Sequence, residues 1–311
     1  MRFEWKAIVG LSMLIIVVSA AASQDLPKFE GPYMGQDPPG SKPAVFLPGV
    51  VSTDKVEACA TFSYDGRFFV FRRGFREDTQ IFLMENRNGV WTAPLPAPFF
   101  VKEYGFGDFT FSPDGSELYF TSRRPLTPGG EATDSANLWK VGYDVGGWLE
   151  PTHLGSTVNS TIHESYPSVS NDGTLYFFRR FDENSGLSEI VYSEWENAGY
   201  SSPKVMGPEI NTQWDEWDPS VSPDGDFLIF CSKKPSGFGM DDLYVSFRRE
   251  DGGWTEAVNL GREINSNRSE NRPFITADGK YLFFNSNVNG SRDVFWIDLD
   301  VVKLLRTVAG E

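Results

Sequence analysis

The stretch from Glu216 to Phe230 reads EWDPSVSPDGDFLIF, and it decides the fold because the chain contains five variants of it. Each variant has a short apolar run, a tight Asp-Gly turn and a stronger apolar run. The turn aspartates are Asp65, Asp114, Asp172, Asp224 and Asp278, which are separated by 49, 58, 52 and 54 residues. A strand-rich period near 50 residues is typical of a β-propeller or another repeat array.

Each repeat supplies the parts of a four-stranded antiparallel sheet. The two apolar runs around Asp-Gly predict a β-hairpin, because glycine takes the positive φ angle that such turns need. A third apolar run follows, for example Asp242 to Val245. A fourth segment then begins at an aromatic residue: Trp91, Trp148, Tyr200 or Trp254. Four strands in about 50 residues indicate one propeller blade for each repeat.

Proline marks the edge of each predicted blade. Pro167, Pro219 and Pro273 lie five residues before the turn aspartate, inside the first apolar run. Because proline cannot donate a hydrogen bond to a neighbouring strand, it belongs on an edge strand. The first strand of each repeat is therefore expected to be the innermost strand of its blade.

The two ends of the chain predict how the ring of blades closes. Residues 42–49 read KPAVFLPG and resemble the fourth segment WTEAVNLG at 254–261, whereas the last repeat has no such segment. The N-terminal strand is therefore expected to complete the last blade, which removes an open sheet edge. We predict an all-β fold over residues 42–311, a single five-bladed β-propeller of four-stranded antiparallel blades, with six blades as the alternative.

The N-terminal residues predict export. Residues 1–22 are typical of a secretory signal peptide: Ile8 to Val18 is apolar but too short to span a bilayer, and Ala20 to Ala22 offer small residues for cleavage. An uncleaved N-terminal anchor is the alternative. Residues 23–41 are rich in Pro and Gly and are expected to form an extended arm. We expect a periplasmic or secreted protein that does not insert into a membrane after cleavage.

Charge and cysteine content narrow the choice of partners. The net charge of −15 repels phosphate backbones and anionic lipids, so nucleic acid is excluded as a partner and a membrane surface is disfavoured. The two cysteines, Cys59 and Cys231, fall in repeats 1 and 4, which do not touch in a five-membered ring. We therefore expect no disulfide, two core-filling thiols and a monomer that binds a protein or a glycan.

The repeats resemble those of the TolB-like β-propeller family, which read Glu-x-x-Pro-x-Phe-Ser-Pro-Asp-Gly followed by Leu-Tyr-Phe. Here the pattern appears as EWDPSVSPDGDFLIF, ESYPSVSNDGTLYFF and ENRPFITADGKYLFF, and the stretch GWTEAVNLGREINS at 253–266 is also typical. The resemblance covers about residues 40–298 and implies the fold. TolB itself has six blades and an additional N-terminal domain. The family resemblance implies no single function, because such repeats occur in partner-binding envelope proteins and in propellers fused to peptidases.

Four glutamates share one position of the repeat, eight residues before the turn aspartate: Glu57, Glu164, Glu216 and Glu270. They are expected at one height near the mouth of the central channel. Such a ring of carboxylates predicts a site for a substrate or for a cation, of which calcium would fit best. Alternatively, each glutamate binds backbone amides as a structural device, and its recurrence in the repeat favours this alternative.

Two residues after the glutamate, the residue type changes from repeat to repeat: Cys59, Asp108, Tyr166, Asp218 and Arg272. Variation at a fixed position of a regular scaffold is where a specific site is expected. Together with His163, Trp214 and Trp217, these residues predict a pocket of aromatic and polar groups that suits sugars or peptides. Solvated loop residues are the alternative interpretation.

The sequence disfavours several kinds of chemistry. Its two histidines have no zinc-ligand spacing, and it contains no Gly-x-Ser-x-Gly motif. A glycosidase needs two carboxylates, which Asp108, Asp218 and Glu164 could supply. Basic pairs recur after the second apolar run, at 72–73, 123–124, 179–180 and 233–234, and either pair with acidic loops or form an anion-binding face. Non-catalytic binding of a protein or glycan is favoured over a glycosidase-like enzyme and over an envelope scaffold.

Overall fold

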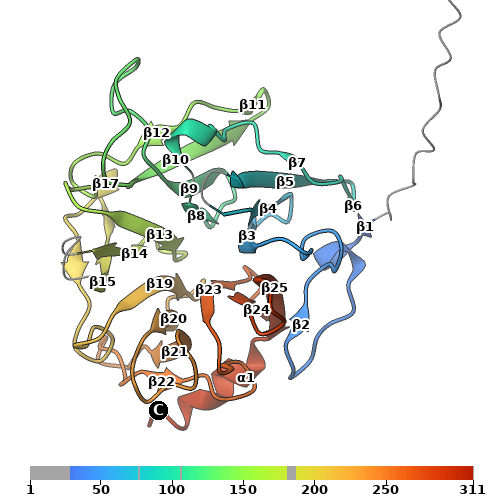
Figure 1. Ribbon diagram of the computed structural model, residues 1–311. Helices are drawn as coiled ribbons and strands as arrows, with labels where there is room; N and C mark the ends of the chain where they lie inside the picture. Colours follow the sequence, from blue (N-terminus) through green and yellow to red (C-terminus); the bar gives the residue numbers. More distant parts are fainter. Residues whose placement is uncertain (1–28, 76–77, 106, 181–186, 311) are drawn as a thin grey trace, which may run out of the picture.

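The computed structural model describes residues 29–75, 78–105, 107–180 and 187–310, so the predicted signal peptide lies outside the described residues. The described residues form five antiparallel sheets arranged in a ring (Figure 1), and a separate two-stranded ribbon of β16 (Trp195–Glu196) and β17 (Gly199–Tyr200). This arrangement confirms the predicted five-bladed β-propeller, and the six-bladed alternative does not hold. Among the described helices, none is long and apolar enough to cross a membrane.

The blades follow one another in chain order, and the first strand of each lies innermost. Blade 1 contains β3 (Glu57–Phe62), β4 (Phe68–Arg73), β5 (Gln80–Arg87) and β7 (Leu95–Pro96). Blade 2 contains β8 (Gly107–Phe111), β9 (Glu117–Ser122), β10 (Asn137–Asp144) and β12 (Thr152–His153). Blade 3 contains β13 (Glu164–Val169), β14 (Leu175–Arg180), β15 (Ser188–Ser193) and β18 (Lys204–Val205).

The last two blades repeat the pattern, and the N-terminal segment takes part in the final one. Blade 4 contains β19 (Glu216–Val221), β20 (Phe227–Ser232), β21 (Asp242–Phe247) and β22 (Val258–Asn259). Blade 5 contains β23 (Glu270–Ile275), β24 (Tyr281–Ser286), β25 (Asp293–Asp298) and β2 (Ala44–Val45). A short helix α1 (Asp300–Lys303) follows β25.

The Asp-Gly turn joins the first two strands in every blade, as predicted. In blade 1 the Ser63 hydroxyl donates to the Asp65 carboxylate at 2.6 Å, and the Arg67 N–H donates to the same oxygen at 3.0 Å. Gly66 takes a φ of +69° to complete the turn. A Ser or Thr hydroxyl donates to the turn aspartate in the other four blades as well, at 2.6 to 2.8 Å. This recurring local bond explains why the motif repeats.

The fourth strands begin later than the aromatic residues that predicted them. Trp91 lies in β6 (Val90–Trp91) and Trp148 in β11 (Gly147–Trp148), two short strands that pair with the ends of β5 and β10. The strands β7 and β12 follow and complete the blades. The Trp148 ring packs against Phe68 of blade 1, with 5.0 Å between ring centroids. The aromatic residue therefore joins neighbouring blades rather than starting the fourth strand.

The N-terminal strand closes the ring. Strand β2 pairs with β25, so the predicted completion of the last blade is confirmed. The next residue, Phe46, is fully buried and packs against Phe62 and Phe69 of blade 1 and against Phe283 and Trp296 of blade 5. Further upstream, strand β1 (Phe29–Glu30) pairs with β6 on the outer side of blade 1. The same segment thus ties the first blade to the last.

We predict that Phe46→Ala lowers the free energy of unfolding by about 3–5 kcal/mol, because it leaves a cavity where the first and last blades meet. Urea unfolding followed by tryptophan fluorescence measures this loss. Leu126→Ala is the control, since Leu126 is 57 % exposed and its loss is expected to cost less than about 0.5 kcal/mol. Equal effects of the two substitutions would contradict the role of Phe46 in ring closure.

Candidate functional site

The site begins with a distortion in the innermost strands. The register between the first and second strands shifts in all five blades, at the position where the sequence varies. There, Cys59, Tyr166, Asp218 and Arg272 have positive φ angles of 51°, 58°, 51° and 54°, which residues other than glycine rarely adopt. A β-bulge redirects the side chain that it carries. Each bulge turns its side chain toward the ring centre, where these residues contact other blades.

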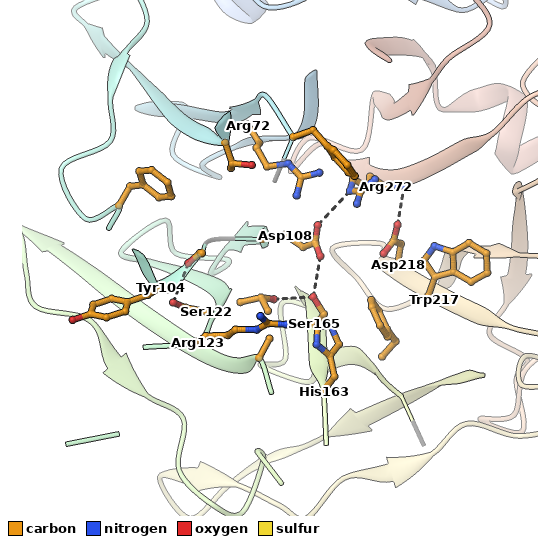
Figure 2. Close-up of a pocket in the computed structure, with 18 of the residues that line it drawn as sticks. Arg72, Tyr104, Asp108, Ser122, Arg123, His163, Ser165, Trp217, Asp218 and Arg272 are labelled. Carbon is orange, nitrogen blue, oxygen red and sulfur yellow. Dashed lines mark hydrogen bonds and ion pairs between the residues drawn. The ribbon is translucent and has the colours of Figure 1, made fainter. Parts of the chain in front are cut away.

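An ion pair crosses the ring centre. Arg272 Nε on β23 lies 3.3 Å from Asp108 Oδ1 on β8, so the pair joins blades 5 and 2 (Figure 2). The Cys59 thiol donates to Asp108 Oδ1 and the Ser165 hydroxyl to Oδ2, both at 2.9 Å. Asp218 Oδ2 accepts the backbone N–H of Arg272 at 3.3 Å. Both oxygens of Asp108 are therefore engaged, by groups from three other blades.

The two aspartates of this cluster have opposite pKa shifts. Burial alone would raise the pKa of Asp108, but the guanidinium groups of Arg272 and Arg72 and the bonds from Cys59 and Ser165 hold that pKa well below its usual range. Burial raises the pKa of Asp218 to about 7; Arg272 opposes this rise and the Asp108 carboxylate adds to it. Near neutral pH, Asp108 is therefore ionised, whereas Asp218 is partly protonated.

A cavity of about 530 Å³ opens beside this cluster at the mouth of the ring (Figure 2). Asp108, Asp218 and Arg272 form part of its wall. Further basic groups line it: Arg72, Lys102, Arg123 and Arg180. Aromatic rings and hydroxyl groups complete the lining, among them Phe100, Tyr104, Phe178, Trp217, Ser122 and Ser165. The cavity thus combines cations, flat apolar faces and hydrogen-bonding groups.

Three arginines of the lining have no ionic partner. Within the described part of the chain, Arg72, Arg123 and Arg180 form no ion pair. Arg123 and Arg180 are exposed, whereas Arg72 is half-buried and its buried Nε has no hydrogen-bond partner. A buried donor without a partner is costly, so this part of the cavity suits an acceptor from a ligand.

Tyr166 closes the ring below the cavity. Its side chain is buried, and its hydroxyl donates to the backbone oxygen of Pro273 on the opposite side at 2.9 Å. Burial raises the pKa of Tyr166 well above its ordinary value, so the phenol stays protonated. The space that remains beside it, lined by prolines of three innermost strands, has a volume of only about 10 Å³. A ligand in the cavity therefore does not continue through the ring.

The structure brings together five of the twelve candidate site residues that the sequence singled out. The predicted residues that line the cavity are Asp108, His163, Trp217, Asp218 and Arg272. Tyr166 lies beneath them. Trp214 is 39 % exposed and lies outside the cavity lining. Burial and the nearby Arg180 lower the pKa of His163, so this side chain is mostly neutral at pH 7.

The recurring glutamates do not reach the cavity. Glu216 is buried and accepts bonds from the Thr212 N–H and hydroxyl at 2.9 and 2.7 Å and from the Ser232 hydroxyl at 3.0 Å. The same bonds to a Ser or Thr four residues upstream recur at three equivalent positions: Glu57, Glu164 and Glu270. This geometry supports the structural alternative, in which each glutamate fixes the loop that enters its blade. Nor do the described residues contain a group of three or more His, Cys, Asp and Glu that could hold a metal ion such as calcium.

Sequence reasoning missed Arg72, Arg123 and Arg180 as a group, although it noted the basic pairs. One member of a pair is bound elsewhere: Arg73 pairs with Glu57 and Arg179 with Glu189, each at 2.8 Å. The other members of these two pairs, Arg72 and Arg180, face the cavity. Arg123 does so as well, whereas Lys233 and Lys234 lie outside the lining. The pairing signal was therefore present in the sequence, but it did not tell which arginine would stay free.

Both cysteines fill the core, as the sequence predicted. Both are buried and free. Cys231 packs in the core between blades 4 and 5, as expected. Cys59 packs in the core between blades 1 and 2, also as expected, and its bulged position additionally makes it a hydrogen-bond donor to Asp108. Burial and the Asp108 charge raise the pKa of Cys59 to about 12, so it is an unreactive thiol.

Comparison with known proteins finds similar folds among solved structures. No family model and no curated protein matches this chain. Among solved structures, it is similar to a putative TolB from Agrobacterium tumefaciens, with 14 % identity over 79 % of this chain and 78 % of that one and a TM-score of 0.51. It is also similar to a thermostable family-43 glycoside hydrolase, with 10 % identity over 79 % and 90 % of the chains and a TM-score of 0.53.

An α-L-arabinofuranosidase from Lactobacillus brevis gives a similar result, with 11 % identity over 78 % of this chain and 90 % of that one and a TM-score of 0.51. At these identities the similarity shows a shared propeller fold and no more. The chain is thus structurally similar to TolB-like and other propellers, which perform unrelated functions on the same scaffold.

The two aspartates are expected to affect stability in opposite directions as the pH changes. Asp218 has a raised pKa when folded, so its contribution to stability is complete below about pH 4 and is lost as the pH rises through about 7. Asp218→Asn removes this loss of stability. Relative to the wild type, the free energy of unfolding of the variant should therefore rise by about 1–3 kcal/mol as the pH increases from 4 to 7. Thermal and urea unfolding across this range measures the gain.

Asp108 should show the reverse trend, because its pKa is lowered in the folded protein. Its contribution is present above its unfolded pKa of about 4 and is lost as the pH falls further. Asp108→Asn should therefore be least stable relative to the wild type at pH 6–8, and the difference should shrink toward pH 3. Asp300→Asn, at an exposed carboxylate, is the control. Parallel pH trends for the two buried sites would contradict the assignment.

Proposed function

We propose that this protein is a non-catalytic binding propeller that holds an anionic glycan in the cavity at the mouth of its ring. The observation that carries this proposal is the set of three arginines, Arg72, Arg123 and Arg180, that line one cavity without an ionic partner among the described residues. Positive charge gathered in a cleft of an otherwise acidic protein concentrates anions there. Guanidinium groups also bind carboxylates and phosphates in a bidentate manner.

The shape of the site favours a glycan over a protein ligand, the two classes expected from the sequence. A volume of about 530 Å³ lies within the range of small-ligand pockets. A folded protein partner would instead need a broad surface of about 800 Å² on each side. Trp217, Tyr104 and Phe100 supply flat faces. The hydroxyl oxygens of Ser122 and Ser165, whose protons are donated to Gly105 and Asp108, can still accept a hydrogen bond. Aromatic faces next to polar groups suit a ring that has both apolar faces and hydroxyls.

Hydrogen bonds that the site's carboxylates already accept within the protein favour non-catalytic binding over catalysis. A general base needs a free oxygen within reach of the substrate, yet both oxygens of Asp108 already accept hydrogen bonds. Glu164 is buried and bound to Ser160, outside the cavity lining. Among the described lining residues, Asp218 and the exposed Glu103 remain as candidate acids. Because Asp108 is already engaged, glycoside hydrolysis would have to use Glu103 together with Asp218.

A glycosidase-like enzyme remains the second candidate, because one observation favours it. Asp108 and Asp218 lie in one cavity and have opposite pKa shifts, the pattern by which an acid and a base are separated. Incubation with acidic oligosaccharides and detection of new reducing ends separates the two functions. Non-catalytic binding gives no turnover, whereas turnover that Asp218→Asn abolishes would establish the enzyme.

The binding test compares matched charge substitutions. We predict that Arg123→Gln and Arg180→Gln each weaken the binding of a uronate oligosaccharide about tenfold or more, because each removes a charged hydrogen-bond donor. Isothermal titration calorimetry measures the affinity. Arg87→Gln is the control, since Arg87 is exposed, pairs with Glu85 and lies outside the cavity lining. Binding that survives both Arg123→Gln and Arg180→Gln unchanged would refute the proposed site.

We further propose that the protein acts in the periplasm or outside the cell as a monomer. The support is the N-terminal sequence, in which Ala20 to Ala22 follow an apolar run. We predict that the mature protein begins at Ser23. Sequencing of the N-terminus of protein from the periplasmic or secreted fraction tests this. A protein that keeps Met1 and stays with the membrane would instead support the uncleaved anchor.

A further inference from the structure

The closed end of the cavity restricts which part of a glycan can enter. Tyr166 and the prolines of the innermost strands fill the ring below Asp108 and Arg272, and only about 10 Å³ remains there. This space has room for about one water molecule. A chain therefore cannot pass through the ring, and the deepest position accepts only a group at the end of a chain.

The net positive charge at the deep end of the cavity would be neutralised by a ligand group with a single negative charge. Arg72 and Arg272 each carry one positive charge there, and Asp108 balances one of them through its ion pair. Asp218 accepts the Arg272 N–H and adds at most a partial negative charge near neutral pH. Arg292 and Asp241 lie outside the lining and carry opposite charges. At most one positive charge thus remains, and Arg72 Nε still has no hydrogen-bond partner among the described residues.

This balance favours a carboxylate over a phosphate. A carboxylate carries one negative charge, whereas a phosphate monoester carries about −1.5 to −2 at pH 7. A dianion would stand beside the ionised Asp108 with only one unbalanced cation, in a half-buried place where like charges repel strongly. The planar carboxylate also fits the fork of donors on a guanidinium group.

A second group of cations lies at the outer end of the cavity. Arg123 and Arg180 are exposed, and both add to the effect of burial, which lowers the pKa of His163. Figure 2 shows Arg72 and Arg123 on opposite sides of Asp108, so the deep and outer cations are separate. A ligand that reaches both groups must carry at least two anionic groups along its length.

We propose that the cavity recognises the end of a carboxylated oligosaccharide, such as a uronate chain. The terminal carboxylate lies against Arg72 and Arg272, and the carboxylate of the next unit lies against Arg123 and Arg180. The terminal ring lies among Trp217, Ser122 and Ser165. This inference rests on the proposed function, because it assumes that the ligand is an anionic glycan.

Calorimetric titration with uronate oligosaccharides of one to six units tests the inference. Affinity should rise by about tenfold from one unit to two and change little thereafter, because the cavity has two cationic positions. Arg72→Gln should lose binding of every length, including the single uronate. Arg123→Gln and Arg180→Gln should lose only the gain from the second unit. Arg87→Gln is the charge-matched control.

The outcomes separate this inference from the function on which it rests. Affinity that keeps rising up to six units, or equal binding of chains whose ends are blocked, would overturn end recognition while anionic glycan binding stands. No binding of any uronate would refute the proposed function itself. Tighter binding of glucose 6-phosphate than of glucuronate would overturn the carboxylate assignment, and binding of a short peptide through its free C-terminus would indicate a peptide ligand.

The test does not depend on a single variant. Arg72 is half-buried, so the thermal midpoint of Arg72→Gln is compared with that of the wild type before titration. If this variant does not fold, the length profiles of Arg123→Gln and Arg180→Gln still decide the question, because both residues are exposed. Equal losses for one-unit and two-unit ligands in those variants would contradict the two-position arrangement.

Discussion

The ion pair between Asp108 and Arg272 depends on the closed ring, and the candidate site depends on this pair. The partners belong to blades 2 and 5, which are not neighbours, so they meet only across the centre. Taking two charges out of water is costly unless the geometry is fixed and the remaining lone pairs are satisfied. Strand β2 fixes the ring by joining blade 5, and Cys59 and Ser165 satisfy the oxygens of Asp108.

The repeat separates residues that build the blade from residues that form the site. The glutamate at the start of each innermost strand binds a Ser or Thr four residues upstream and holds the incoming loop, so it recurs unchanged in four blades. Two residues later, the bulge presents a side chain to the centre without a role in the sheet. That position can therefore hold Cys59, Asp108, Tyr166, Asp218 or Arg272 at little cost to the blade, and together these residues make a surface that has no fivefold symmetry.

The sequence predicted the fold well because each part of the repeat has a local cause. The Asp-Gly turn, the edge proline and the matching segment at 42–49 each obey short-range rules. It predicted the site in part: variation at one repeat position identified Asp108, Asp218 and Arg272. It did not identify Arg72. The equivalent positions of the other blades hold Thr121, Phe178, Cys231 and Asn285, which share no chemistry. Which arginine of a pair faces the cavity depends on side-chain alternation next to a bulge, and this requires the structure.

An approaching anion meets the acidic surface before it reaches the basic cavity, and this order favours a small ligand over a large one. At physiological ionic strength, charges are screened beyond about 8 Å, so an approaching group senses mainly the charges nearest to it. A large flat polyanion such as a nucleic acid or a lipid surface meets the acidic exterior first and is repelled. A narrow anionic group can reach Arg123 and Arg180 at the cavity entrance, and beyond them Arg72 lies in a half-buried place where attraction is stronger. A net charge of −15 is therefore compatible with an anion-binding site, because the charge excludes wide anions and the recess admits narrow ones.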